Sequence, residues 1–206
     1  MVKLIIVRHG HVEGIEPERF RGRTDVPLTP EGRRQAIVTA GCIASRWEPA
    51  VVYTSPLQRC IQTASAIAGG CHVEVAVQED LNDLNYGSWQ WQLHSEVRGK
   101  SPGLFDCWLA APHLMRFPDG EALQDLLARA ANVVRMAMKR HPLDTVVLVS
   151  HDSVIRAMLL QLLDQPVSAY WRIVPAPCSI SEVDIVGHGV RVIGINETHH
   201  LEKASS

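Results

Sequence analysis

The segment of this sequence best equipped for chemistry is Arg8-His9-Gly10, which directly follows the apolar run 4–7. An arginine offers a permanent positive charge and a planar set of donors that suits a phosphate group. A histidine can act as a nucleophile or carry a proton, and a glycine lets a backbone or a ligand come close. The segment therefore predicts a phosphate site.

Polar residues also end two later apolar runs. Arg59 lies in the first turn of the helix expected after residues 51–54, and His151 follows residues 146–149. The carboxyl ends of parallel strands meet at one edge of a sheet, which is where ligands bind in open α/β folds. We therefore expect Arg59 and His151 to lie beside His9, around one phosphoryl group.

The elements that would position these groups alternate along the chain. Apolar runs predict strands at 2–7, 51–54, 72–77, 146–149, 179–186 and 190–195, the last two joined around Gly187-His188-Gly189. Apolar residues at helical spacing predict helices from Thr29-Pro30 to about 47, from Ser55-Pro56 to about 68, over 121–140 and over 153–163. In both Thr-Pro and Ser-Pro the first residue is expected to cap the helix. This order predicts an α/β fold, with a mainly parallel central sheet and helices on both faces.

One region breaks the alternation. Residues 80–120 hold several tryptophans, prolines and glycines with weak periodicity, which predicts a small irregular cap or lid insertion. With 206 residues the chain is long enough for one domain with a sizeable core. We therefore expect a single domain over 1–206 that carries this insertion, followed by a loose tail after about Thr198.

Composition argues against several classes of protein. The net charge of -2 lacks the basic excess of a nucleic-acid binder, and no apolar stretch approaches the length of a membrane span. The five cysteines are scattered without CxxC spacing, which favours reduced thiols over disulfides or a zinc site. Because the first residues also lack a signal-peptide pattern, we expect a cytoplasmic protein without membrane or nucleic-acid partners.

Taken in order, the motifs resemble the histidine phosphatase superfamily, also called phosphoglycerate-mutase-like proteins. The matching segments are Arg8-His9-Gly10, Arg19-Phe20-Arg21-Gly22, Asp25 to Thr29, Tyr53 to Arg59, Asp80 to Trp89, Pro118 to Glu121 and Val149 to His151. The resemblance implies a metal-independent, cofactor-free phosphomonoester hydrolase that acts on a small phosphorylated metabolite. It further implies a covalent phosphohistidine on His9, with Arg8, Arg59 and His151 around the phosphoryl oxygens.

The resemblance also implies an acid that protonates the leaving oxygen. The family commonly uses a glutamate, and the matching position here is Asp83, one methylene shorter. Asp152 is an alternative, because one branch of the superfamily takes its acid from beside the second histidine; otherwise it would cap the helix it precedes. Glu79 is a third candidate.

Substrate contacts are expected from the loop after the first strand. Arg19, Arg21 and Gly22 fall in a family motif and would form a basic rim that draws in anionic substrates; the arginines could equally be a solvated loop face. After Gly10 the sequence departs from the family pattern. His11-Val12 and Ile15 stand where a Glu-Thr pair and an asparagine are expected.

Two other activities stay open at this point. One is a phosphoglycerate-mutase-type phosphotransferase, and the other is a phosphate-binding or protein-interaction module without turnover. The stretch from Asn85 to Gln90 resembles the phosphatase branch more than the mutases. The individual substrate and the oligomeric state, a homodimer included, are left open as well.

Overall fold

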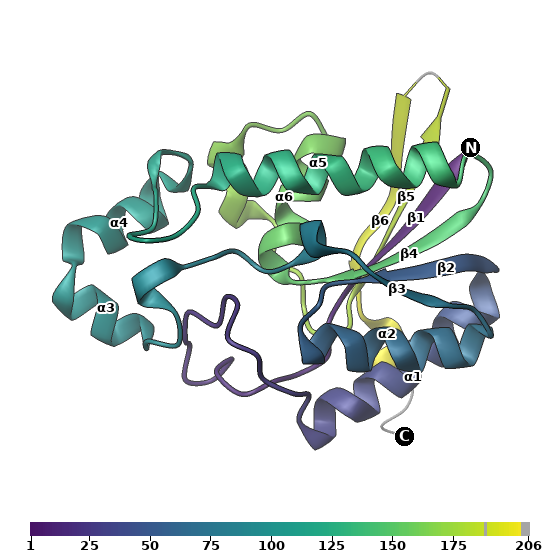
Figure 1. The fold of residues 1–206 in the computed structure, drawn as a ribbon, viewed down its shortest axis with the longest axis horizontal. Helices are drawn as coiled ribbons and strands as arrows, with labels where there is room; N and C mark the ends of the chain where they lie inside the picture. Colours follow the sequence, from purple (N-terminus) through teal and green to yellow (C-terminus); the bar gives the residue numbers. More distant parts are fainter. Residues whose placement is uncertain (188, 203–206) are drawn as a thin grey trace.

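The computed structural model describes residues 1–187 and 189–202. Its centre is a six-stranded sheet in the order β3-β2-β4-β1-β5-β6 (Figure 1). The strands are β1 Val2–Arg8, β2 Pro49–Thr54, β3 Val75–Val77, β4 Thr145–Ser150, β5 Ile180–Val186 and β6 Gly189–Glu197. Strands β3, β2, β4 and β1 run parallel, and β5 is antiparallel to both β1 and β6. The predicted α/β class with a mainly parallel sheet is confirmed.

Helices cover both faces of this sheet. They are α1 Pro30–Arg46, α2 Gln58–Cys71, α3 His94–Lys100, α4 Pro102–Ala110, α5 Leu123–Arg140, α6 Asp152–Leu162 and α7 His199–Glu202, with short 3-10 helices η1 Glu79–Leu81, η2 Gly87–Trp89, η3 Pro112–Leu114 and η4 Val167–Arg172. Helices α1 and α2 lie on one face, and α5 and α6 on the other (Figure 1). None of the helices in the described ranges is long and apolar enough to cross a membrane.

The first strand explains why both faces must be covered. Successive side chains of a strand point to opposite faces of the sheet. Ile5 and Val7 pack in the cluster that includes residues of α1 and α2, whereas Leu4 and Ile6 pack in the cluster that includes residues of α5 and α6. An unbroken apolar run therefore occupies the middle of the sheet and delivers its polar end to the sheet's edge.

The segment between β3 and α5 extends beyond the sheet, with α3 and α4 farthest out (Figure 1). Aromatic side chains tie it to the loop after β1: the ring centroid of Phe20 lies 5.1 Å from that of Trp89 and 5.1 Å from that of Tyr86. Trp89 and Trp108 are buried in the same cluster as the sheet residues Leu4 and Ile6. One hydrophobic core thus continues from the sheet into this segment.

Several boundaries differ from the sequence predictions. The strand expected over 72–77 is limited to Val75–Val77, because His72 adopts a left-handed conformation that ends α2. The tail expected to be loose forms α7, where His200 Nε2 lies 3.0 Å from Thr39 Oγ1. His188 of the predicted turn and residues 203–206 of the tail lie outside the described residues.

The predicted cap at Thr29 is present, whereas the one at Ser55 is wrong. Thr29 Oγ1 accepts a hydrogen bond from the Gly32 amide at the start of α1. Helix α2 begins only at Gln58, after the N-cap residue Leu57, and the Gln58 amide donates to Asp25 Oδ1 at 2.8 Å. The Ser55 hydroxyl instead lies 2.8 Å from Nε2 of His151, so a residue that resembles a cap belongs to the site described next.

Candidate active site

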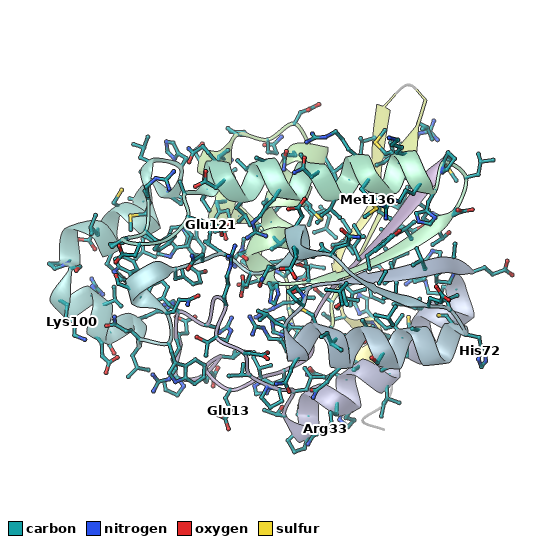
Figure 2. All side chains as sticks on the ribbon, in the orientation of Figure 1. Glu13, Arg33, His72, Lys100, Glu121 and Met136 are labelled. Atoms are coloured by element: carbon teal, nitrogen blue, oxygen red, sulfur yellow. The ribbon has the colours of Figure 1, made fainter. Side chains whose placement is uncertain are left out.

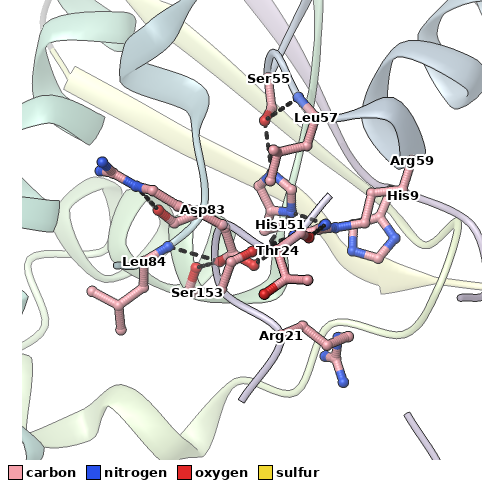
Figure 3. Close-up of polar contacts among 12 residues, drawn as sticks. His9, Arg21, Thr24, Ser55, Leu57, Arg59, Asp83, Leu84, His151 and Ser153 are labelled. Atoms are coloured by element: carbon pink, nitrogen blue, oxygen red, sulfur yellow. Dashed lines mark hydrogen bonds and ion pairs between the residues drawn. The ribbon is translucent and has the colours of Figure 1, made fainter. Parts of the chain in front are cut away.

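The carboxyl ends of β1, β2 and β4 bring the predicted residues together (Figure 3). Arg8 at the end of β1 pairs in register with Ser150 at the end of β4, and the His9 amide donates to the Ser150 carbonyl at 3.0 Å. As a result the ring centroids of His9 and His151 are 5.3 Å apart. The expectation that these two histidines are neighbours is confirmed by this geometry.

His9 is held as a neutral imidazole. Its Nδ1 lies 2.7 Å from the Gly10 carbonyl oxygen, which can only accept, so the proton resides on Nδ1 and the lone pair on Nε2. Burial, together with the charges of Arg59 and Arg8, holds the pKa of His9 well below its ordinary value. The ring therefore has a free, unprotonated Nε2 in a cationic surrounding.

Close backbone contact positions the end of β1. A Cβ atom at Gly10 would lie 2.5 Å from the carbonyl oxygen of Gly32, at the start of α1. The Gly10 amide also donates to Thr63 Oγ1 of α2 at 3.1 Å. A glycine at this position thus lets β1 approach both helices, which fixes the residue that precedes it.

Arg8 and Arg59 are buried cations. Nη1 of Arg8 donates to the Pro175 carbonyl at 2.7 Å, while its buried Nε has no hydrogen-bond partner among the described residues. Nη1 and Nη2 of Arg59 donate to the carbonyls of Thr24 at 2.8 Å and Gly22 at 2.6 Å. A buried donor without a partner is costly, so Arg8 is suited to an incoming anion.

His151 has a protein partner on each ring nitrogen. Nε of Arg59 donates to Nδ1 at 3.2 Å, which puts the His151 proton on Nε2, and this nitrogen donates to Ser55 Oγ. Burial and the charge of Arg59 lower the pKa of His151 well below its ordinary value. In this arrangement His151 is neutral and held on both sides.

The pKa values of the two candidate acids beside the histidines are shifted in opposite directions. Asp83 is buried and accepts hydrogen bonds from Ser153 Oγ and the Leu84 amide, and burial raises its pKa. Burial by itself would raise the pKa of Asp152 as well, but the charges of Arg8 and Arg156 hold that pKa well below the usual range. A raised pKa makes Asp83 the stronger candidate for the proton donor.

The third candidate acid, Glu79, is exposed on η1. Within residues 1–187 and 189–202, no group of three or more His, Cys, Asp or Glu side chains is arranged to hold a metal ion.

A charged network that we did not predict holds the backbone of Asp83. Nη2 of Arg129 donates to the Asp83 carbonyl at 2.9 Å, and its Nε donates to Glu121 at 3.0 Å. Glu121, labelled in Figure 2, also receives Nη2 of Arg23 at 3.0 Å. A sequence signal existed, because Arg129 interrupts the apolar face of α5 between Leu126 and Val133.

A cavity opens beside the buried cluster. The residues that line it include the predicted substrate contacts Arg19, Arg21 and Gly22 as well as Asp83, but not His9, which is 1% exposed. The lining also includes Arg156, which sequence reasoning missed. The sequence signal for Arg156 was its position four residues after Asp152, which puts the two side chains on one face of a helix. Asp152 lines the same cavity.

The residues that depart from the family pattern lie away from this cavity. Val12 is fully buried in a small cluster with Leu28 and Ala36, and Nδ1 of His11 is 2.9 Å from Thr29 Oγ1. Neither lines the cavity. In this chain the two positions therefore serve packing of the loop onto α1.

The mainly parallel sheet and the arginines and histidines at its carboxyl edge are typical of α/β enzymes of phosphoryl transfer. The chain belongs to the histidine phosphatase superfamily (branch 1), whose family model matches residues 4–198.

Known proteins of similar sequence and structure agree with this membership. Phosphoserine phosphatase 1 of Hydrogenobacter thermophilus is 34% identical over 201 residues, which cover 98% of this chain and 95% of that protein. Glucosyl-3-phosphoglycerate phosphatase of Mycolicibacterium vanbaalenii is 30% identical, with 90% of this chain and 84% of that protein covered. The solved structure of Bacillus stearothermophilus YhfR superimposes with a TM-score of 0.91 at 29% identity, covering 98% of this chain and 100% of that one.

These findings confirm the predicted family and the predicted class of enzyme. The chain is a phosphomonoester hydrolase.

Proposed function

We propose that this chain hydrolyses a small phosphorylated metabolite in two steps, through a covalent phosphohistidine on His9. Arg8, Arg59 and His151 surround the phosphoryl group, and Asp83 is the proton donor. Arg19, Arg21 and Gly22 contact the rest of the substrate. The observation that carries the proposal is the hydrogen bond of His9 Nδ1 to the Gly10 carbonyl at 2.7 Å, because in the neutral ring it makes Nε2 the unprotonated nitrogen beside two buried arginines.

In the first step, the lone pair of His9 Nε2 forms a bond to phosphorus while the bond from phosphorus to the leaving oxygen breaks. The proton of the Asp83 carboxyl passes to that oxygen, so the product leaves as an alcohol. Arg8 and Arg59 offset the negative charge on the non-bridging oxygens. The enzyme is left with a phosphorylated His9 and an ionised Asp83.

In the second step, a water molecule attacks phosphorus and the bond from nitrogen to phosphorus breaks. The Asp83 carboxylate takes a proton from this water and is thereby returned to its starting state. Inorganic phosphate leaves, and His9 recovers its free lone pair. Each step uses groups of the chain itself, and the protons balance over the cycle.

The similarity to a phosphoserine phosphatase and to a glucosyl-3-phosphoglycerate phosphatase supports a small phosphomonoester as substrate. The test is phosphate release from a panel of phosphorylated metabolites, including O-phosphoserine and 3-phosphoglycerate, by the native chain and by His9→Ala. Rapid quenching should trap an acid-labile, base-stable phosphoenzyme in the native chain only.

The matched control is His11→Ala, which removes a histidine two positions away that does not line the cavity. It should retain phosphate release. Activity that survives in His9→Ala would refute the mechanism.

A further inference from the structure

We propose that Arg156 and Asp152 form the subsite that recognises the part of the substrate remote from phosphorus: Arg156 binds a carboxylate and Asp152 binds an ammonium group. The substrate class that fits is a phosphorylated α-amino acid. This inference rests on the proposed function and assigns two residues to the same cavity that the proposed phosphoryl site adjoins.

Arg156 is fixed in place yet not saturated with partners. Its Cζ lies 4.8 Å from the ring centroid of Trp171 and 5.2 Å from that of Tyr170, an arrangement that stacks the guanidinium on aromatic faces. Nε donates to the Ile173 carbonyl at 2.7 Å. Nη1 lies 3.5 Å from Asp152 Oδ2, too far for a strong hydrogen bond. Its terminal donors are therefore available in the cavity.

Asp152 complements Arg156 from one helical turn away. Its side chain is 21% exposed and that of Arg156 is 9% exposed, and both line the cavity. Apart from the 3.5 Å contact with Nη1 of Arg156, the Asp152 carboxylate accepts no hydrogen bond from a described residue. The carboxylate is thus a charged acceptor with free capacity, directed at the same space as the arginine.

The pairing selects for a substrate that carries both charges. In an α-amino acid the carboxylate and the ammonium are attached to one carbon, so the two can meet Arg156 and Asp152 at once. The substrate carboxylate then pairs with Arg156 and the substrate ammonium with Asp152, in place of the long contact between the two side chains. Each partly buried charge therefore keeps an oppositely charged partner. A substrate with a carboxylate only would bring a second negative charge next to Asp152, which costs affinity.

The test compares three substrates that share the phosphoester. O-phosphoserine carries both charged groups, O-phosphoethanolamine lacks the carboxylate, and 3-phosphoglycerate lacks the ammonium. In Arg156→Met the ratio of kcat/KM for O-phosphoserine to that for O-phosphoethanolamine should fall about tenfold or more, mainly through KM. In Asp152→Asn the ratio for O-phosphoserine to 3-phosphoglycerate should fall by a similar factor. Arg156→Lys, which keeps the charge, should recover part of the first ratio.

Ratios within about threefold of the native values would overturn the subsite, because a merely structural role lowers turnover of all substrates alike. Thermal unfolding of each variant shows whether it folds; if Arg156→Met does not, Arg156→Lys and Asp152→Asn decide. A native chain that hydrolyses other phosphomonoesters but not O-phosphoserine would overturn the subsite alone. A native chain that releases phosphate from no substrate would overturn the proposed function as well.

Discussion

Nη2 of Arg59 donates a hydrogen bond to Oδ2 of Asp83 at 3.0 Å, and both side chains are buried (Figure 3). The proposed proton donor is therefore in contact with one of the proposed phosphate ligands. A phosphoryl group that binds Arg59 competes with Asp83 for the same guanidinium. We expect substrate binding to weaken this contact and so to favour the protonated form of Asp83, which is the form that the first step needs.

Replacing Asp83 by asparagine removes the proposed proton donor with little change of shape. Turnover of O-phosphoserine, whose leaving alkoxide needs a proton, should fall about 10²- to 10⁴-fold. Turnover of p-nitrophenyl phosphate should fall far less, because its leaving group is stable as an anion. The measurement is kcat with both substrates, and the matched control is Glu79→Gln at the exposed alternative acid. Equal losses on both substrates in Asp83→Asn would rule out this role.

The pH profile of kcat/KM should be bell-shaped. Activity requires neutral His9, whose pKa is lowered by burial and by Arg59, so the rate rises with pH through that low pKa. Activity also requires protonated Asp83, whose pKa burial raises, so the rate falls as pH passes that value. Asp83→Asn should lose the alkaline limb of the O-phosphoserine profile and keep the acid limb. An unchanged alkaline limb in this variant would assign it to another group.

The network under Asp83 should matter for stability. Arg129 and Glu121 are 11% and 16% exposed, so Arg129→Met leaves a largely buried carboxylate without its main partner. We expect the free energy of unfolding in urea to fall by about 3 kcal/mol. The matched control is Arg34→Met, whose pair with Glu31 is 46% exposed on both sides, and it should leave the free energy of unfolding almost unchanged. Similar losses in the two variants would contradict this account.

The contact between Gly10 and Gly32 predicts a contrast between two glycines. Gly10→Ala would put a methyl group 2.5 Å from the backbone oxygen of Gly32, so we expect it to lose about 1–3 kcal/mol or more of unfolding free energy. Gly41 lies within α1 with nothing near its Cβ position, and Gly41→Ala should gain about 0.5–1 kcal/mol. Chemical denaturation of both variants measures the difference. If Gly10→Ala left the free energy of unfolding unchanged, β1 and α1 would be able to move apart at little cost.

The order of elements could be predicted because each depends on local pattern. The unbroken apolar run of β1 indicated a strand covered on both faces, and Thr29-Pro30 marked the start of α1 correctly. Ser55-Pro56 has the same pattern, but Ser55 does not cap the helix, because its hydroxyl bonds to a group that the fold brings beside it. That partner, His151, is 96 positions away in sequence.

From the sequence alone we could predict the family, the strand ends that carry Arg8, His9 and His151, and the basic loop with Arg19 and Arg21. These features are motifs or periodicities within single segments. Their roles in catalysis stay predictions that the experiments above address.

The preference for Asp83 over Asp152, and the positions of Arg129 and Arg156, depend on the tertiary structure. Whether a carboxyl holds a proton depends on burial and on charges brought from distant segments: Asp83 lies in a desolvated site, whereas Asp152 faces Arg8 and Arg156. The same holds for the tautomers of the two histidines, which are set by neighbours such as Gly10 and Arg59. Such distances and desolvation arise only once the chain has packed, and for that reason no local pattern contains them.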